Sequence, residues 1–332
     1  RCVRPQPSLA SSGTGSFTAT IKPVTSFASA EANFADELLG YDIAAAANRK
    51  FQADRLLGLL RKAPGGRLTL TSETPVTTSD VTGATTIYYT PYTDDSIVLW
   101  DGTRWVAGVF ANTSLALGTV TSGLPYDVFG YLNGGVLTLE KLAWTNGTTR
   151  ATEVTIQDGR YCKSGDKTRL YLGTFYTTST SATEDSAAKR FLWNMYNRLP
   201  RYVKVVESST SWNYTTASWR SMNNSTANRV QFIRGLNNDP VSVQFQGAGS
   251  SSVGNTGATA IGLDSTSAPS GLAAMIGGGG YAYFSTVTAL YNELPGLGFH
   301  YLQALELGMA NGIFYGTNSP YCTNGLTGTL MA

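Results

Sequence analysis

The stretch TEDSAAKRFLWNMYNRLPR, residues 183–201, stands out because the sequence on both sides of it is typical of short β-strands. Ser181 and Glu184 have the spacing of a capping box, in which two side chains satisfy free backbone N–H groups at the start of a helix. Pro200 ends the pattern, because proline cannot continue a helix interior. The pattern predicts a short amphipathic helix over residues 183–198. Its apolar face consists of Ala188, Phe191, Leu192 and Met195.

The block that contains this segment, residues 66–207, is predicted to be a β domain that ends in the helix. Turn signals separate its strands, and Asp101-Gly102 between two apolar runs is a strong hairpin signal. Roughly eight short strands spaced about 8–12 residues apart indicate an antiparallel sandwich or barrel. The expected strands are Arg67–Thr71, Thr86–Thr90, Ile97–Trp100, Trp105–Phe110, Tyr126–Tyr131, Val136–Trp144, Thr152–Ile156 and Arg169–Phe175.

The last block, residues 208–332, is predicted to be a second antiparallel β domain, a jelly-roll-like sandwich. It follows the strand Tyr202–Val206, with which the first block resumes its β pattern after the helix. Gly247–Gly257 and Gly277–Gly280 are interpreted as long loops, and loops on a β scaffold commonly carry recognition. The expected strands are Val230–Ile233, Val241–Phe245, Ala258–Leu263, Tyr281–Ala289, Gly298–Leu307 and Gly312–Tyr315.

The N-terminal part of the sequence differs from both blocks. Residues 1–25 are rich in Pro, Ser, Thr and Gly, which predicts an extended arm that docks on another subunit. Residues 26–65 are predicted to be a helical attachment or oligomerisation segment that ends at Pro64-Gly65-Gly66. Its narrow stripe cannot bury itself, so it packs either on copies of itself or on its own β domain, and the sequence leaves both open. The stripe consists of Phe34, Leu38, Tyr41, Ala45 and Ala46.

The composition excludes several classes of protein. Only 14% of the 332 residues are charged, compared with about 25% in an average soluble domain. A surface kept polar by Ser, Thr, Asn and Tyr is typical of extracellular β proteins and viral coats. The net charge is +2 without a long basic run, which argues against a nucleic-acid partner. No apolar run reaches the length of about 18 residues that a transmembrane helix needs, so no membrane insertion is expected.

The sequence contains no motif for a metal, a nucleotide or a disulfide framework. The three cysteines, Cys2, Cys162 and Cys322, are far apart and odd in number, although a single bridge among them stays open. No cluster of His, Cys, Asp and Glu has the spacing of metal ligands. Gly277–Gly280 is not followed by Lys and Ser or Thr, so it is not a phosphate loop. We therefore expect no cofactor.

No catalytic motif is evident. His300 is the single histidine, and no Gly-x-Ser-x-Gly elbow accompanies it, so it is interpreted as structural. A glycosidase would need two carboxylates about 5–9 Å apart, and each acidic candidate has a structural explanation, such as a turn or the first turn of the predicted helix. We therefore expect no catalytic, cofactor-binding or metal-binding residues. The acidic candidates are Asp94, Asp95, Asp101, Asp127, Glu184, Asp185, Glu293 and Glu306.

Two further groups of residues are notable. Basic residues cluster near the predicted helix at Arg190, Arg198, Arg201 and Lys204. They can bind an anion, but cations near a helix C-terminus are favoured by the helix dipole, so a solvated helix face is the preferred interpretation. Aromatic residues crowd both blocks, where they can contact sugars, subunits or the core. They are Tyr88, Tyr89, Tyr92, Trp100, Trp105, Trp212, Tyr214 and Trp219.

A series of short segments, in order along the chain, resembles a module of tailed-bacteriophage and prophage virion proteins. The resemblance extends from about Gly66 to Leu236, half of the chain, and includes the predicted helix. The N-terminal arm and the residues after Asn237 lie outside it. The segments are Arg67–Thr71, Tyr88–Tyr92, Trp100–Gly102, Gly123–Phe129, Ala143–Asn146, Leu172–Phe175, Thr183–Arg201, Ser218–Ser225 and Arg229–Phe232.

This resemblance implies a non-enzymatic virion component, such as a tail-fibre, head-fibre or other appendage protein, with no catalytic or cofactor residues. It implies a fibre or spike component that contributes to host-surface attachment. The expected partners are further copies in a homotrimer, other virion proteins through the N-terminal arm, and a host glycan or protein. The alternatives are a purely architectural capsid-decoration or baseplate protein and a polysaccharide depolymerase.

Overall fold

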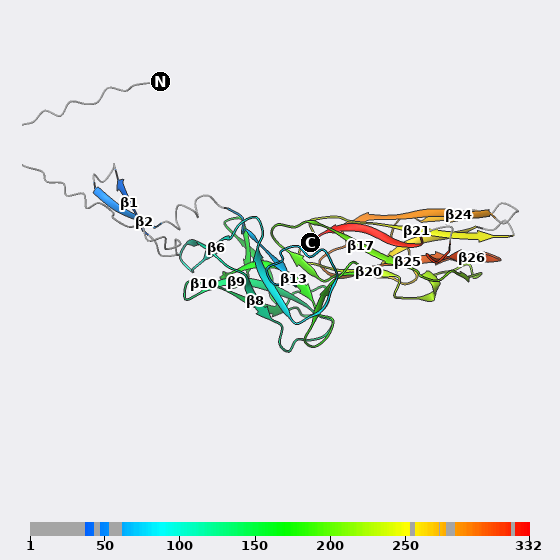
Figure 1. Ribbon diagram of the computed structural model, residues 1–332, viewed down its shortest axis with the longest axis horizontal. Coiled ribbons are helices and arrows are strands. Elements are labelled where there is room, and N and C mark those ends of the chain that lie inside the picture. The colour runs from blue at the N-terminus through cyan, green and yellow to red at the C-terminus, as the bar shows by residue number, and fades with distance from the viewer. Residues whose placement is uncertain are drawn as a thin grey trace, which may run out of the picture.

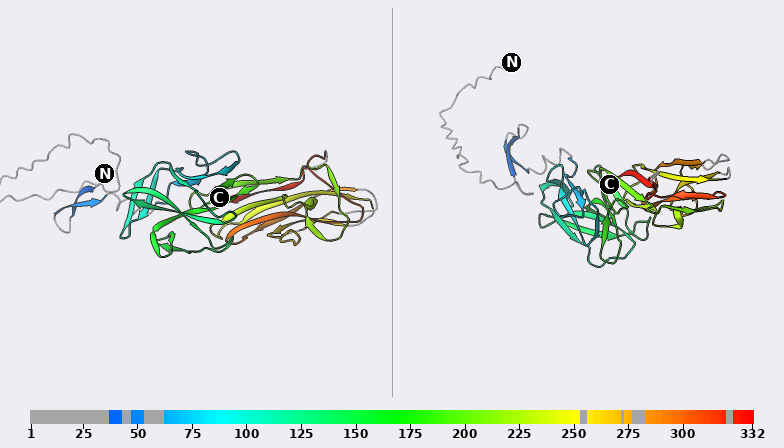
Figure 2. Two further views of the ribbon diagram at one scale, coloured as in Figure 1. Left: turned by 90° about the horizontal axis from the view of Figure 1, so that it is seen from below. Right: turned by 45° about the vertical axis from the view of Figure 1, so that its right-hand side comes forward.

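The structure is mainly β, as predicted. Over residues 62–332 the chain forms two β lobes arranged end to end in an elongated molecule (Figure 1, Figure 2). The described residues contain no α-helix, and their one helical element is the 3₁₀ turn η1 at Met222–Asn224. The computed structural model describes residues 37–42, 47–52, 62–252, 256–271, 273–276, 283–319 and 323–332.

The first lobe is built from small antiparallel sheets around one core. The sheets have the strand orders β10-β9-β13-β12-β11, β3-β5-β8 and β6-β7. Asp101-Gly102 joins β6 to β7, which confirms the predicted hairpin. The core includes Leu68, Ile87, Leu99, Val128, Leu172 and Phe175. The strands are β3 Gly66–Thr69, β4 Val81–Ala84, β5 Thr86–Pro91, β6 Ser96–Trp100, β7 Trp105–Val109, β8 Thr113–Ala116, β9 Pro125–Asn133, β10 Val136–Ala143, β11 Val154–Gln157, β12 Arg160–Lys163 and β13 Asp166–Tyr176.

The second lobe consists of two sheets that share a core. One sheet contains β22, β25 and β20, and the other contains β17, β27 and β21, with β24 paired to β21. Val230, Ile261 and Leu302 of the first sheet pack with Val243, Phe245 and Leu326 of the second. The strands are β17 Pro200–Val206, β18 Ser211–Asn213, β19 Trp219–Ser221, β20 Arg229–Arg234, β21 Val241–Ser251, β22 Gly257–Leu263, β23 Ala274–Ile276, β24 Tyr283–Glu293, β25 Gly298–Leu307, β26 Gly312–Tyr315 and β27 Gly325–Met331.

The expectation of a loop over Gly247–Gly257 is wrong for its first part, because β21 continues to Ser251. The small residues there reflect close approach of the two sheets. A Cβ atom on Gly247 would overlap the side chain of Thr259 on the facing sheet. Gly247 is therefore small because the two sheets pack closely at this position, and not because the chain turns there. Residues 253–255 and the run Gly277–Gly280 lie outside the described residues.

The predicted helix over residues 183–198 is also wrong. The segment forms three short strands, β14 Thr183–Asp185, β15 Lys189–Arg190 and β16 Leu192–Asn194. β14 pairs with β4, and β16 pairs with β13, so both bind to the first lobe. β15 runs parallel to β20 of the second lobe. The segment is therefore an extended junction between the two lobes.

Tertiary hydrogen bonds explain why this segment is not helical. Its carbonyls accept from backbone N–H groups of both lobes: Phe191 from Tyr176 and Ala188 from Gln231, each at 2.9 Å. Alternate side chains enter different environments: Leu192 lies in the first-lobe core, and Trp193 lies in the cluster that joins the second-lobe core to Phe129 and Tyr171 of the first lobe. A helix of this length is marginal in water without packing, so strand pairing on both sides prevails over the local propensity.

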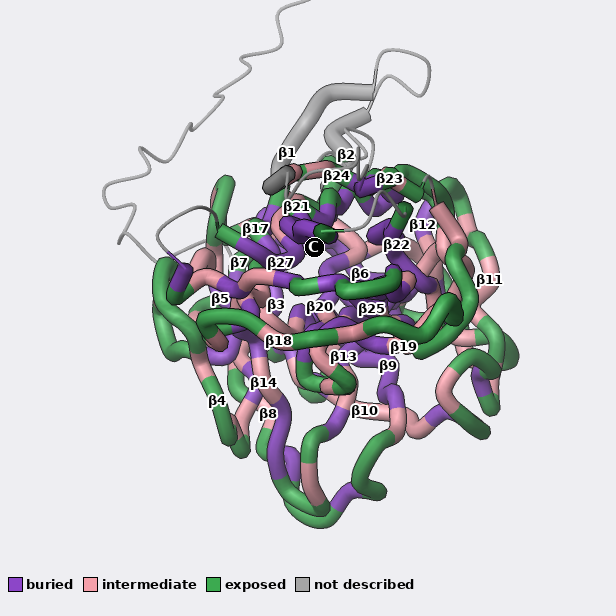
Figure 3. Tube along the Cα trace, turned by 90° about the vertical axis from the view of Figure 1, so that its right-hand side faces the viewer, coloured by how far each residue is buried: buried purple, intermediate pink, exposed green. Residues whose placement is uncertain are grey.

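The junction also moves the boundary between the lobes. β17, which the sequence placed in the first β domain, pairs with β27 along its whole length and belongs to a second-lobe sheet. The other second-lobe sheet continues across the junction in the order β23-β22-β25-β20-β15-β14-β4. Figure 3 looks along the molecule and shows the buried residues concentrated near its centre. The two lobes are therefore joined by a shared sheet as well as by the chain.

Part of the predicted N-terminal helix is described as strands instead. β1 Glu37–Asp42 pairs antiparallel with β2 Ala47–Gln52, so the helix prediction is wrong over these residues. The remainder of that segment up to residue 61 and the predicted arm, residues 1–25, lie outside the described residues. In the part of the chain that the structure describes, no helix has the length and apolar character to cross a membrane.

Replacement of Trp193 by alanine tests the junction. Trp193 is fully buried, so we expect the variant to lose about 3–5 kcal/mol of unfolding free energy. Urea unfolding followed by circular dichroism measures this loss. The control Ile156→Ala, at a side chain that is 57% exposed, should change the stability by about 0.5 kcal/mol or less. Equal effects of the two substitutions would contradict the described packing.

Candidate functional site

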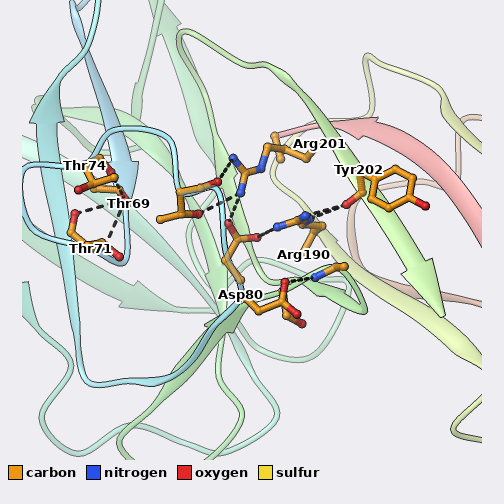
Figure 4. A network of polar contacts seen from close by, with 12 residues as sticks. Thr69, Thr71, Thr74, Asp80, Arg190, Arg201 and Tyr202 are labelled. Carbon is orange, nitrogen blue, oxygen red and sulfur yellow. Dashed lines mark hydrogen bonds and ion pairs between the residues drawn. The ribbon is translucent and has the colours of Figure 1, made fainter.

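A buried ionic network lies at the junction of the lobes (Figure 4). The carboxylate of Asp185 accepts hydrogen bonds from Arg190 Nη1 at 3.1 Å and from Arg201 Nη2 at 3.0 Å. All three side chains are about nine-tenths buried. Arg190 also donates through Nε and Nη2 to the carbonyl oxygen of Tyr202, at 3.1 and 2.7 Å. One carboxylate thus compensates two guanidinium groups, and one of these groups fixes the backbone of β17.

The network extends into the first lobe. Arg201 donates to the carbonyl and hydroxyl oxygens of Thr77, at 3.2 and 3.1 Å, and Asp80 accepts from the backbone N–H of Ala187 at 2.8 Å. Arg67 donates to the carbonyl of Ala332 at 3.0 Å. Burial and the charge of nearby Arg201 lower the pKa of Arg67 to about 10. The hollow between these groups is about 10 Å³, which is room for roughly one water molecule and not for a substrate.

A second buried ion pair lies in the first lobe, and one of its members also binds the second lobe. Arg150 binds the carboxylate of Asp127 through Nε at 2.6 Å and Nη2 at 3.2 Å, and Nη2 also donates to the carbonyl of Gly235 at 2.7 Å. Thr174 donates to the same carboxylate at 2.6 Å. Burial raises the pKa of Asp127, although Arg150 acts in the opposite direction. Asp127 therefore has a complete set of structural partners.

Glu306 is fully buried within the second lobe. It accepts from Trp212 Nε1 and Arg220 Nε, both at 2.8 Å, and from the backbone N–H of Asn223 at 3.2 Å. Burial raises its pKa, against the effect of these donors. Glu293, at the end of β24, is exposed. Glu306 therefore binds groups inside the second lobe, whereas Glu293 faces the surface.

Two further acidic candidates, Asp94 and Asp101, stabilise local turns. Asp94 accepts from the backbone of Ser96 at 2.8 Å and pairs with Lys62 at 2.9 Å. Partial burial acts to raise the pKa of Asp94, but the hydrogen bonds from Ser96 and Lys62 outweigh it and lower this pKa to about 2. Asp101 accepts from two backbone N–H groups of its hairpin turn. No group of three potential metal ligands occurs among the residues that the structure describes.

Among the described residues, His300 and Cys162 lie in no catalytic arrangement. His300 Nδ1 lies 2.7 Å from Asp264 Oδ2, and its buried Nε2 has no hydrogen-bond partner within the described residues. Cys162 is a buried free thiol, and burial raises its pKa to about 11. Cys2 and Cys322 lie outside the described residues.

The structure corrects the interpretation of the basic cluster. Arg190 and Arg201 are buried around Asp185, so they are not a solvated helix face, whereas Lys204 is exposed on β17. Several of the aromatic candidates pack inside the lobes: Tyr89 stacks on Phe110, and Trp212 stacks on Phe314.

The sequence analysis missed a hollow on the outer face of the second lobe. Alternation along β17, β27, β21 and β24 points one set of side chains into the core and the other set outward. The outward set lines a shallow, open hollow of about 370 Å³. Its main lining side chains are Tyr202, Ser242, Gln244, Leu290, Thr327 and Thr329. The signal in the sequence was the alternation of β21, but the four strands that build the hollow come from distant parts of the chain.

The comparisons with known proteins do not place the chain in a family. No family model and no curated protein matches it. Among solved structures, the chain is similar to a Bacillus thuringiensis Cry1Da tryptic core variant, with 8% sequence identity and a TM-score of 0.20. The match covers 75% of this chain and 48% of the other, so this chain corresponds to about half the length of that protein. A TM-score this low carries no argument about fold or function.

Replacement of Asp185 by asparagine tests the junction network. The variant leaves two buried guanidinium groups without their counter-charge, so we expect a loss of about 3–5 kcal/mol in unfolding free energy. The neighbouring Glu184→Gln is a matched control, because Glu184 pairs with Lys189, which is 37% exposed. The control should lose about 1 kcal/mol or less. Urea unfolding of both variants measures the difference, and equal losses would contradict the proposed importance of Asp185.

Proposed function

We propose that the chain is a structural virion protein of a tailed bacteriophage, a non-enzymatic fibre or spike component that contributes to attachment at the host surface. The resemblance of residues 66–236 to virion proteins supports this proposal. The observation that carries it is the elongated pair of lobes, joined through a junction where the buried Arg201–Asp185 ion pair and the hydrogen bond from Arg150 to Gly235 connect them (Figure 1). Such a junction suits an appendage that must hold its distal lobe in a fixed direction.

The buried carboxylates support a non-enzymatic role. Asp127, Asp185 and Glu306 are engaged by arginines inside the protein, which leaves these carboxylates without the access to substrate that a glycosidase needs. The charge-poor surface supports many weak neutral contacts, which gain strength when several copies bind together. In this proposal, the N-terminal segment contacts other virion proteins and the second lobe faces the host.

Position on the virion and competition for adsorption test this proposal. Gold-labelled antibodies against the chain should decorate an appendage on particles of the phage or prophage that encodes it. The purified full chain, incubated with host cells beforehand, should slow adsorption of these particles in a concentration-dependent way.

Other outcomes would replace the proposal. Label on the capsid surface or the baseplate without any slowing of adsorption would indicate a purely architectural protein. Release of new reducing ends from host polysaccharide would indicate a depolymerase, provided that substitution of an acidic residue abolished the release.

A homotrimer is part of the same proposal, because fibre proteins of this kind are commonly trimers. Light scattering coupled to size-exclusion chromatography should give a mass three times that of the 35.3 kDa chain. A monomeric mass at micromolar concentration would contradict the trimer.

A further inference from the structure

The hollow on the second lobe has a defined register. Tyr202, Thr329 and Ser242 lie side by side on β17, β27 and β21. In the next outward row, Thr327 lies opposite Gln244, which lies opposite Leu290 on β24. Three inter-strand steps separate β17 from β24, a width of about 14 Å. The hollow is thus a groove across four strands, with a hydroxyl- and amide-bearing floor.

The side chains of the groove lining carry no charge. Lys204, opposite Thr327 in the register, lies beside the groove on β17 and not among its lining residues. Hydroxyl and amide groups both donate and accept hydrogen bonds, and Gln244 Nε2 donates to Thr327 Oγ1 at 3.3 Å. A floor of this kind complements a neutral ligand that also carries both donors and acceptors.

The two edges of the groove are apolar. Tyr202 on β17 is 49% exposed, and Leu290 on β24 is 48% exposed. The two side chains lie on opposite edges and do not form one apolar patch, but a hollow that combines apolar side chains with a few polar groups is typical of a ligand site. Tyrosine offers a flat apolar face together with a polar hydroxyl. These edges fit a ligand with an apolar face as well as hydroxyl groups.

Tyr202 is also held in place by the junction. Arg190 fixes its backbone carbonyl through two hydrogen bonds, and pairing with Thr329 sets its register. The adjacent residue Val203 is fully buried in the core. An aromatic ring on such a rigid strand needs little ordering when it binds a ligand.

We propose that this groove binds a neutral, hydroxyl-rich oligosaccharide of the host surface, with the Tyr202 ring stacked on a sugar ring. Ser242, Gln244, Thr327 and Thr329 provide hydrogen bonds to its hydroxyl groups, and Leu290 closes the far edge. Sugars combine an apolar C–H face with hydroxyl groups, as the groove requires. The identification of the host surface as the source rests on the proposed attachment function, whereas the chemistry of the ligand rests on the groove.

Binding to immobilised oligosaccharides tests this inference. The full chain is applied to neutral oligosaccharides of glucose, galactose, mannose and N-acetylglucosamine, and to acidic ones that contain uronic acid. We expect binding to one or more neutral probes in preference to the acidic ones. Tyr202→Ala should weaken this binding by about tenfold or more, and Tyr202→Phe should retain most of it. Tyr92→Ala, at a 40% exposed tyrosine of the first lobe, is the matched control.

Several outcomes would overturn the groove assignment. These are binding that Tyr202→Ala leaves unchanged, preference for acidic probes, and no binding to any neutral probe. A change in oligomeric mass on Thr327→Arg would also overturn it and would make the groove a contact between copies. Urea unfolding confirms that each variant is folded.

Different results would overturn the groove assignment and the proposed attachment function. If the unmodified chain and Tyr202→Ala slow phage adsorption equally, the groove assignment fails and attachment stands. If neutral probes bind through Tyr202 but the chain does not affect adsorption, the groove stands and the attachment function fails.

Discussion

Asp185 supplies the counter-charge for two arginines that are buried where the lobes meet. Without it, Arg190 and Arg201 would be buried without a counter-charge, which costs about 3–5 kcal/mol of stability. Through these two arginines, Asp185 connects the edge of the first lobe near Thr77 to the backbone of β17. The extended path of residues 183–198, the shared sheet and the orientation of the second lobe all depend on this arrangement.

The same constraint extends to the surface. Arg190 binds Asp185 on one side and the carbonyl of Tyr202 on the other. The junction therefore also sets the position of Tyr202, the residue proposed to stack on a sugar ring in the groove. Only 14% of the residues in this chain are charged, and their placement differs between the interior and the groove. Several of them are placed in the interior as ion pairs, while the groove on the exterior is lined by neutral side chains.

Local patterns predicted the strands well where alternation and turn chemistry act together. The bounds of β25 and β26 match the expected strands Gly298–Leu307 and Gly312–Tyr315, and the hairpin at Asp101-Gly102 formed as expected. Residues 183–198 were misread because two of their strand partners, β4 and β20, are distant in sequence. Side chains of the segment also enter the cores of both lobes, so it has no solvent-facing side of the kind that the helix prediction assumed. The groove could not be predicted, since it needs the register of four separate strands.

Hydrogen–deuterium exchange at residue resolution tests most directly whether the junction unites the two lobes. The decisive groups are the backbone N–H of Gln231 and Lys204, which bond to the carbonyls of Ala188 and Ala187 across the junction. The account predicts that these amides exchange as slowly as those in the cores of both lobes, because they open only with global unfolding. Rapid exchange at Gln231 and Lys204, while both cores stay protected, would contradict it.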